Sequence, residues 1–172
     1  DICTNAALLA AARAAEPDAA LSYKPHPDVV AGLRPGAVDA SDADLVVADA
    51  DIAALLGQVD AVWTMTSLTG FEALLRGVPV TVTGAPFYAG WGLTRDLGDV
   101  PPRRRAQVTL EGLVHAALID YPRYRAPVSG LPCTVEVVAE RLASGQSLRG
   151  GPALRSLSKL QGLLAPYAHL WR

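Results

Sequence analysis

Hydrophobic and polar residues in the first 83 positions alternate between short β-prone runs and helical patterns. The β-prone runs are separated by helical patterns and breakers and cover residues 21–24, 45–48, 61–65 and 79–83. Helical patterns lie at 4–15, where Thr4 is a suitable cap, and at 52–56 and 68–75. Helical connections join parallel strands by right-handed crossovers, so the pattern predicts an α/β fold with a Rossmann-like, doubly wound parallel sheet.

The pattern changes after the fourth run. Residues 85–92 form a loop rich in aromatic residues and glycine, and no strand is predicted there or in the following Pro and Arg residues. Helical spacing returns at 110–118 behind Thr109, at 135–142 behind Thr134, and at 154–164. We therefore expect a Rossmann-like lobe over residues 1–145 and a helical extension over 146–172 packed on it, within a single domain.

Composition narrows the class of protein. The 172 residues are 51% hydrophobic and 19% charged, which excludes a disordered chain and predicts one domain with a real core. No apolar run is long enough to span a membrane and no signal peptide is apparent, so the sequence predicts a soluble cytoplasmic protein. Cys3 and Cys133 lack metal-ligand spacing, and the net charge of −2 argues against nucleic acid as a partner.

The first candidate for chemistry is the segment Lys24-Pro25-His26-Pro27-Asp28, directly after the first β-prone run. Two prolines restrict the backbone around His26, whose imidazole could donate to a phosphate oxygen or move a proton. Lys24 would add a compact positive charge. The alternative is a proline-rich turn in which His26 only bonds a neighbouring carbonyl or the Asp28 side chain.

The second candidate is the segment 64–72, which runs from the third β-prone run into a helix. Ser67 is a natural N-cap, and the hydroxyls of Thr66 and Ser67 precede the helix, where a phosphate can be bound. Glu72 lies off the apolar face and could accept hydrogen bonds from a ribose. In the alternative, Ser67 only caps the helix and Glu72 forms an exposed ion pair with Arg76.

The carboxyl ends of parallel strands share one edge of a sheet, so we expect both segments to face a single pocket. Phosphate donors and a carboxylate for ribose suit a sugar nucleotide, and the glycine-rich and Walker motifs of dinucleotide and triphosphate sites are absent. The aromatic loop 87–91 would cover a sugar ring, a partner domain or the loop's own core. Residues 103–105, all Arg, form either a solvated run or a contact with an acidic sugar or anionic lipid.

Four motifs carry a resemblance to a known family. They are YKPHPD at 23–28, TMTSLTGFEALLRG at 64–77, PFYAGWGLT at 86–94 and YPRY at 121–124. Over about residues 1–142 the chain closely resembles the bacterial capsule polysaccharide biosynthesis proteins of the KpsC type, which are retaining β-Kdo glycosyltransferases. The His-Pro motif and the Ser…Glu pair alone also resemble bacterial sialyltransferases and teichoic acid polymerases.

The resemblance implies the C-terminal, nucleotide-binding lobe of a GT-B-type glycosyltransferase with CMP-β-Kdo as donor and no metal or other cofactor. By motif, Lys24 and His26 would face the phosphate, and His26 is also the candidate catalytic residue. The nucleotide-binding set would be completed by residues of the second segment, namely Thr66, Ser67, Gly70 and Glu72, with Glu72 on the ribose. Tyr88 and Trp91 would contact the sugar or the other lobe.

The family's acidic nucleophile falls upstream of the residues matched here, so the resemblance implies that this chain is inactive without an N-terminal lobe. Expected partners are that lobe, a lipid-linked acceptor and capsule assembly proteins at the cytoplasmic face of the inner membrane, where the protein would be peripheral. Two alternatives stay open: a transferase with another CMP or CDP donor, of sialyltransferase or glycerophosphotransferase type, and a capsule assembly or export scaffold without catalysis.

Overall fold

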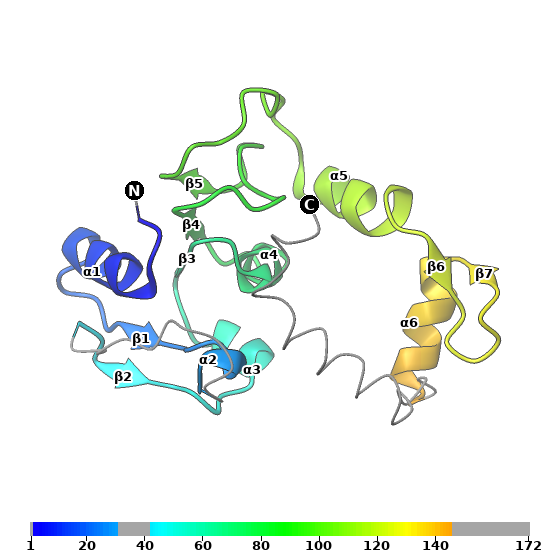
Figure 1. Ribbon diagram of the computed structural model, residues 1–172, viewed down its shortest axis with the longest axis horizontal. Coiled ribbons are helices and arrows are strands. Elements are labelled where there is room, and N and C mark those ends of the chain that lie inside the picture. Colours follow the sequence, from blue (N-terminus) through cyan, green and yellow to red (C-terminus); the bar gives the residue numbers. More distant parts are fainter. Residues whose placement is uncertain (1, 31–41, 146–172) are drawn as a thin grey trace, which may run out of the picture. The chain divides into compact units, whose positions relative to one another are not determined.

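The computed structural model describes residues 2–30 and 42–145 of the chain (Figure 1). The chain divides into two compact units, Asp1–Leu113 and Val114–Arg172, and each is described by itself. The helical extension expected at 146–172 lies outside the described residues.

The first unit alternates helices and strands. In chain order its elements are α1 (Asn5–Ala15), β1 (Ser22–Tyr23), α2 (Pro27–Val30), β2 (Leu45–Val46), α3 (Ile52–Leu56), β3 (Val62–Thr64), α4 (Leu68–Leu74), β4 (Val80–Val82) and β5 (Arg95–Asp96). Every strand pair in this unit is parallel, so the α/β fold expected from the sequence is confirmed.

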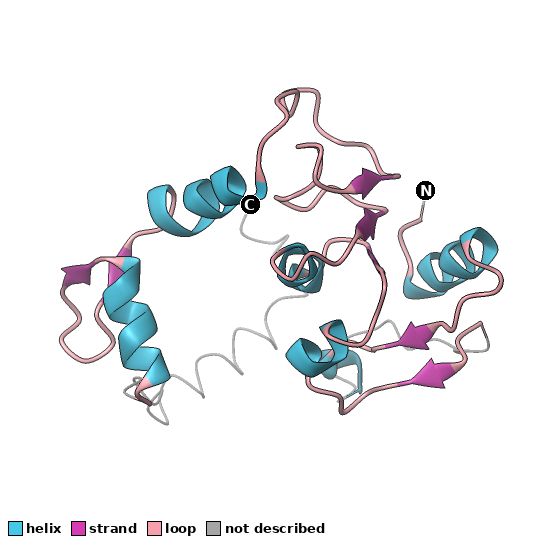
Figure 2. Ribbon diagram, turned by 180° about the vertical axis from the view of Figure 1, so that it is seen from behind, coloured by secondary structure: helices cyan, strands magenta, loops and turns pink. Residues whose placement is uncertain are grey.

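The strands of the first unit pair in two hydrogen-bonded groups. β1 pairs with β2, and β3, β4 and β5 form a three-stranded sheet in that order (Figure 1 and Figure 2). In the larger sheet Val62 lies opposite Val80, and Thr81 lies opposite Arg95. The sequence predicted four strands here, and the structure adds a fifth, because Arg95–Asp96 pairs with β4 at the edge of the sheet.

Helix starts in the first unit follow the capping residues. The Thr4 hydroxyl accepts the Ala7 N–H at 3.1 Å, and the Asp51 carboxylate accepts the Ala54 N–H at 2.9 Å. Each bond satisfies a backbone donor that the helix itself cannot pair. These side chains explain why α1 and α3 begin where the sequence predicts.

The core of the first unit lies between α4 and the three-stranded sheet. All three residues of β4 are buried, and Val82 has no exposed surface. From α4, Phe71, Ala73 and Leu74 are buried, and this helix contacts both β3 and β4. Burying this apolar face fixes how α4 lies on the sheet, and with it the residues at the start of the helix.

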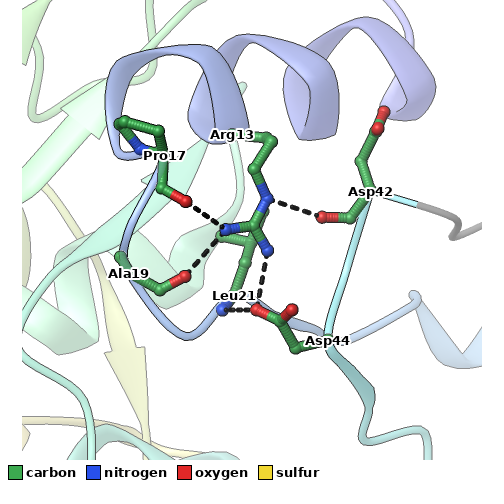
Figure 3. Close-up of polar contacts among 6 residues, drawn as sticks. All are labelled: Arg13, Pro17, Ala19, Leu21, Asp42 and Asp44. Atoms are coloured by element: carbon green, nitrogen blue, oxygen red, sulfur yellow. Dashed lines mark hydrogen bonds and ion pairs between the residues drawn. The ribbon is translucent and has the colours of Figure 1, made fainter.

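Arg13 of α1 joins three parts of the first unit (Figure 3). Its guanidinium forms an ion pair with Asp44 at 2.6 Å and donates to backbone carbonyls of Pro17, Ala19 and Asp42. The Asp44 carboxylate also accepts the Leu21 N–H at 2.7 Å. This backbone bond and then the Arg13 guanidinium hold the pKa of the Asp44 carboxyl below its usual value. The starts of β1 and β2 are thereby fixed to α1.

The second unit is less regular than the helical region predicted for it. α5 (Leu110–His115), which begins within the first unit, is capped by Thr109 and continues into the π-helical turn η1 (Ala116–Asp120). An antiparallel pair, β6 (Tyr124–Arg125) and β7 (Pro132–Cys133), precedes α6 (Val135–Ala143). The sequence predicted both α-helices but neither the π-helical turn nor the strand pair. Within the described ranges, no helix is long and apolar enough to cross a membrane.

Candidate functional site

Lys24 connects the ends of β1 and β2. Its ammonium donates to the backbone carbonyl of Ala48 at 3.0 Å, and the side chain is partly buried. An ammonium group has three protons, so this bond leaves two donors for another acceptor. The predicted positive charge after β1 is therefore present and is held in place by the residues that follow β2.

His26 caps the short helix α2. Its ring Nδ1 accepts the backbone N–H of Asp28 at 3.1 Å, and its carbonyl accepts the N–H groups of Val29 and Val30. Because Nδ1 is an acceptor, the neutral imidazole carries its proton on Nε2. The side chain is 53% exposed, so this proton is accessible to a ligand. The alternative interpretation expected a bond to the Asp28 side chain or a carbonyl, whereas the ring bonds the Asp28 backbone N–H and its Nδ1 lies 3.6 Å from the Asp28 carboxylate. This local contact is compatible with a phosphate-donor role for Nε2.

Ser67 caps α4, as the sequence predicts. Its hydroxyl accepts the Thr69 N–H at 3.2 Å and lies 3.1 Å from the Thr69 hydroxyl. The buried Thr64 hydroxyl accepts the N–H of Ser67. Thr66 and Ser67 are exposed, and the backbone N–H groups of Thr66 and Leu68 have no acceptor among the described residues. This short segment therefore offers several hydrogen-bond donors to an anion.

Glu72 is partly exposed on α4, and its carboxylate forms no hydrogen bond or ion pair with any described residue. Arg76 donates to the backbone carbonyl of Glu72 at 2.9 Å instead of pairing with the carboxylate. The alternative interpretation, an ion pair between these two side chains, is therefore wrong. A carboxylate without a protein partner is free to accept hydrogen bonds from a ligand.

Tyr88 is fully buried, and its hydroxyl donates to the backbone carbonyl of Ser67. The expectation that Tyr88 contacts a sugar is corrected, because its ring has no exposed surface and belongs to the core of its own loop. The ring also explains Gly70: a β-carbon there would lie 2.3 Å from the Tyr88 hydroxyl. Gly70 is buried, and it permits this close approach.

Trp91 and Arg104 hold the outer part of the same loop. The Trp91 indole donates to the Phe87 carbonyl at 2.8 Å, and the Arg104 guanidinium lies 5.8 Å from the Trp91 ring centroid. Arg104 also donates to the carbonyls of Pro86 and Ala89. The expectation of a solvated arginine run does not hold for this residue, because it is partly buried and fixes the aromatic loop.

Backbones approach closely just beyond β4 and β5. A β-carbon at Gly84 would lie 2.9 Å from the Met65 carbonyl oxygen, and one at Gly98 would lie 2.3 Å from that of Thr83. The segments that follow β3, β4 and β5 are therefore packed backbone against backbone. The sequence shows these glycines but gives no sign of which atoms they face.

The structure gathers Thr66, Ser67, Gly70 and Tyr88 around the start of α4, with Glu72 one turn further along. Within residues 2–30 and 42–145, no hydrogen bond or ion pair links Lys24 or His26 to that group. The convergence of the two segments on one ligand stays a prediction.

Sequence reasoning missed a surface cavity of about 520 Å³ in the second unit. It lies between the strand pair, the end of η1 and the start of α6, and cationic, apolar and thiol side chains are among those that line it. Its lining residues are Ile119, Pro122, Arg123, Tyr124, Arg125, Pro132, Cys133, Thr134, Val135 and Glu136. The sequence signal for the hairpin that shapes it is weak, because the strands contain two residues each.

Comparison with solved structures places the chain in the class of proteins that have a glycosyltransferase fold. The chain is similar to the structure described as Thermosulfurimonas dismutans KpsC, beta Kdo 2,7 transferase, with a TM-score of 0.74 and 36% identity over 86% of this chain and 48% of that one. A second structure, described as the beta Kdo 2,4 transferase of the same protein, gives a TM-score of 0.72 and 35% identity over 83% and 45%.

The sequence comparisons then give the family. The family model described as capsule polysaccharide biosynthesis protein matches residues 2–124. The chain is 44% identical over 152 residues to the capsule polysaccharide modification protein LipA of Neisseria meningitidis serogroup B, covering 86% of this chain and 21% of LipA. It is 42% identical over 144 residues to the lipopolysaccharide-processing protein LpsZ of Rhizobium meliloti, covering 81% and 32%.

This chain therefore belongs to the capsule polysaccharide biosynthesis protein family and is of the KpsC type, which confirms the resemblance drawn from its motifs. It spans about a fifth to a third of the length of these curated relatives.

Proposed function

We propose that this chain is the CMP-sugar-binding part of a glycosyltransferase that transfers Kdo from CMP-β-Kdo during capsule polysaccharide biosynthesis. The observation that carries the proposal is the Glu72 carboxylate, which has no partner among the described residues and follows the exposed donors at the start of its helix. Glu72 lies five positions after Ser67, a rise of about 7.5 Å along a helix axis. One nucleotide spans a similar distance between its phosphate and its ribose hydroxyls.

The phosphate of the donor would be bound by the Thr66 and Ser67 hydroxyls and by the free N–H groups of Thr66 and Leu68. The Ser67 hydroxyl already faces Thr69, so a phosphate would replace the Thr69 oxygen as its acceptor. Several short hydrogen bonds to a charged oxygen are stronger than bonds between neutral groups. Glu72 would then accept the ribose hydroxyls.

Lys24 and His26 would complete the phosphate site from the end of β1. The Nε2 proton of His26 is placed to donate, because Nδ1 is occupied by the Asp28 N–H. The neutral ring can donate this hydrogen bond to the phosphate. To pass a proton to the leaving group the ring must first be an imidazolium, whose Nδ1–H would face the Asp28 carboxylate, 3.6 Å away, instead of accepting the Asp28 N–H. The two solved neighbours are described as Kdo transferases, which supports Kdo as the transferred sugar.

A retaining mechanism needs a nucleophilic carboxylate, and we assign none in this chain. We therefore propose that the chain binds the donor but does not turn it over alone. The lipid-linked acceptor, the capsule assembly partners and the peripheral position at the inner membrane stay predictions from the family resemblance.

The test is calorimetric titration of the 172-residue chain with CMP, with CDP and UMP as competitors. We expect Glu72→Gln to weaken CMP binding by about tenfold or more, because bonds to a charged group are lost. The variant should keep the melting temperature of the parent, because the carboxylate stabilises nothing in the described chain. Ser67→Ala and His26→Ala should also weaken binding, and Ser67→Ala should cost about 1 kcal/mol of stability as a lost cap.

Glu140→Gln is the matched control, because Glu140 is an exposed glutamate on α6 in the second unit. It should bind CMP like the parent. Unchanged CMP affinity in all three site variants would remove the site assignment. A stronger response to CDP than to CMP would change the donor. A chain whose melting temperature no cytidine nucleotide raises would be a scaffold instead, because a ligand of the native state must stabilise it.

A further inference from the structure

Tyr88 forms a hydrogen bond within the protein that is not one of the proposed contacts to the ligand. Its hydroxyl donates to the Ser67 carbonyl, while the Gly70 N–H is the other donor to that oxygen, at 3.2 Å. Burial raises the pKa of Tyr88 to about 12, so the hydroxyl keeps its proton throughout the neutral range. The peptide between Ser67 and Leu68 is therefore held from the side of the aromatic loop.

The Tyr88 ring itself is packed too closely to move. Its Cζ atom would lie 2.8 Å from a β-carbon at Gly70, so it sits directly against the backbone of α4. Phe71 and Phe87 flank it, with ring centroids 6.3 and 5.3 Å from that of Tyr88. Aromatic packing of this kind fixes both the position and the tilt of the ring.

The loop that carries Tyr88 also has polar supports outside α4. On either side of the tyrosine, Arg104 binds the carbonyls of Pro86 and Ala89, and the Asp96 carboxylate accepts the Gly90 N–H at 2.9 Å. Gly90 has a positive φ of 83°, which sets the turn that follows. Because its own supports lie in residues 96–104, the loop can act on Ser67 as a fixed support.

We propose that Tyr88 is a positioning residue for the nucleotide phosphate: through the Ser67 carbonyl it fixes the orientation of the Thr66 and Ser67 donors. The inference rests on the proposed function and goes beyond it, since Tyr88 has no exposed surface and touches no ligand. Its hydrogen bond acts at the phosphate end of the site, whereas Glu72 acts at the ribose end. Loss of the bond should therefore weaken ligands that carry a phosphate and spare those that do not.

The experiment is NMR titration of the 172-residue chain with CMP and with cytidine, which lacks the phosphate. Tyr88→Phe keeps the ring and removes only the donor. We expect its CMP affinity to fall by about two- to tenfold, the range for one neutral hydrogen bond, and its cytidine affinity to stay unchanged. Tyr124→Phe is the matched control, because the Tyr124 hydroxyl donates to the Leu118 carbonyl at 2.7 Å in the second unit. It should alter neither affinity.

Each of the following results overturns the positioning role unless stated otherwise. An unchanged CMP affinity in Tyr88→Phe overturns the role and leaves the proposed function intact. An equal loss of affinity for CMP and for cytidine also overturns it, because such a loss marks a general structural effect. A parent chain that binds no CMP removes the proposed function and the positioning role together. If Tyr88→Phe does not fold, Arg104→Lys decides, because it loosens the loop from outside. A selective loss of CMP affinity then supports the role, and no selective loss overturns it.

Discussion

Replacing Gly70 with alanine tests the packing at the start of α4 most directly. The new β-carbon would lie 2.3 Å from the Tyr88 hydroxyl oxygen and 2.8 Å from Cζ, so either the ring or the helix must shift. Overpacking a tight site costs about 1–3 kcal/mol. Losing the hydrogen bond from Tyr88 to Ser67 adds about 1 kcal/mol, while the better helix propensity of alanine returns about 1 kcal/mol.

The net cost of Gly70→Ala is therefore about 1–3 kcal/mol, which lowers the melting temperature of a chain of this size by about 2–12 °C. Thermal unfolding followed by circular dichroism measures it. Gly57→Ala is the matched control, because Gly57 has a φ of −79° and a β-carbon there meets only the Ala54 oxygen, at 3.4 Å. That variant should be as stable as the parent or slightly more stable.

A double-mutant cycle identifies the colliding group. Tyr88→Phe deletes the nearest atom but leaves Cζ, so Gly70→Ala should cost less in that background than in the parent. Two results would refute the reasoning: a Gly70→Ala chain at least as stable as the parent, or an identical cost in both backgrounds. Either would mean that the tyrosine does not press on α4.

Two further predictions concern pH. The pKa of the Asp44 carboxyl is lowered in the folded chain, so its stabilisation is present above the unfolded value of about 3.9 and is lost as pH falls through the folded value. Asp44→Asn should therefore lower the melting temperature at pH 7, and the gap to the parent should close near pH 2, whereas the exposed Asp18→Asn should show no gap at either pH. Burial raises the pKa of Tyr88 to about 12, so its effect on stability depends on pH in the opposite direction: the stabilisation is complete below about pH 10 and is lost as pH rises toward 12. Between pH 9 and 11 the melting temperature of Tyr88→Phe should fall less than that of the parent; an equal fall would show that the buried hydroxyl is not responsible.

The described helices other than α2 and the first four strands could be predicted from the sequence because local signals define them, whereas α2 (Pro27–Val30) was expected to be a turn. Thr4, Asp51, Ser67 and Thr109 each accept an N–H at the start of a helix, and such hydroxyl and carboxylate caps are visible in the sequence. β4 is a run of buried residues, which hydrophobicity also reveals.

The missed elements depend on contacts that are distant or weak in the sequence. Arg95–Asp96 is polar and becomes a strand only because it lies beside β4. The π-helical turn at Ala116–Asp120 has no residue pattern of its own, since it differs from the preceding α-helix only in its backbone hydrogen bonds.

The same distinction applies to the candidate site. Ser67 was predictable as a cap and Glu72 as a residue off the apolar face, because both follow from helix geometry. The burial of Tyr88 was not predictable, because Phe87, Tyr88 and Trp91 are neighbours in one loop and the sequence does not show which ring points inward. In the structure Tyr88 is buried and Phe87 is 42% exposed. The family resemblance assigns Gly70 to the nucleotide site, whereas in the structure Gly70 faces the Tyr88 ring.

The backbone contacts beyond β4 and β5 limit how this edge of the sheet can be redesigned. Any side chain at Gly84 or Gly98 would force neighbouring main-chain segments apart, since a carbonyl oxygen already occupies the space. Laboratory evolution toward a different ligand would gain little from randomising these two positions. Diversity is better introduced at Thr66, which is exposed, whereas a change at the equally exposed Ser67 would remove the cap of α4.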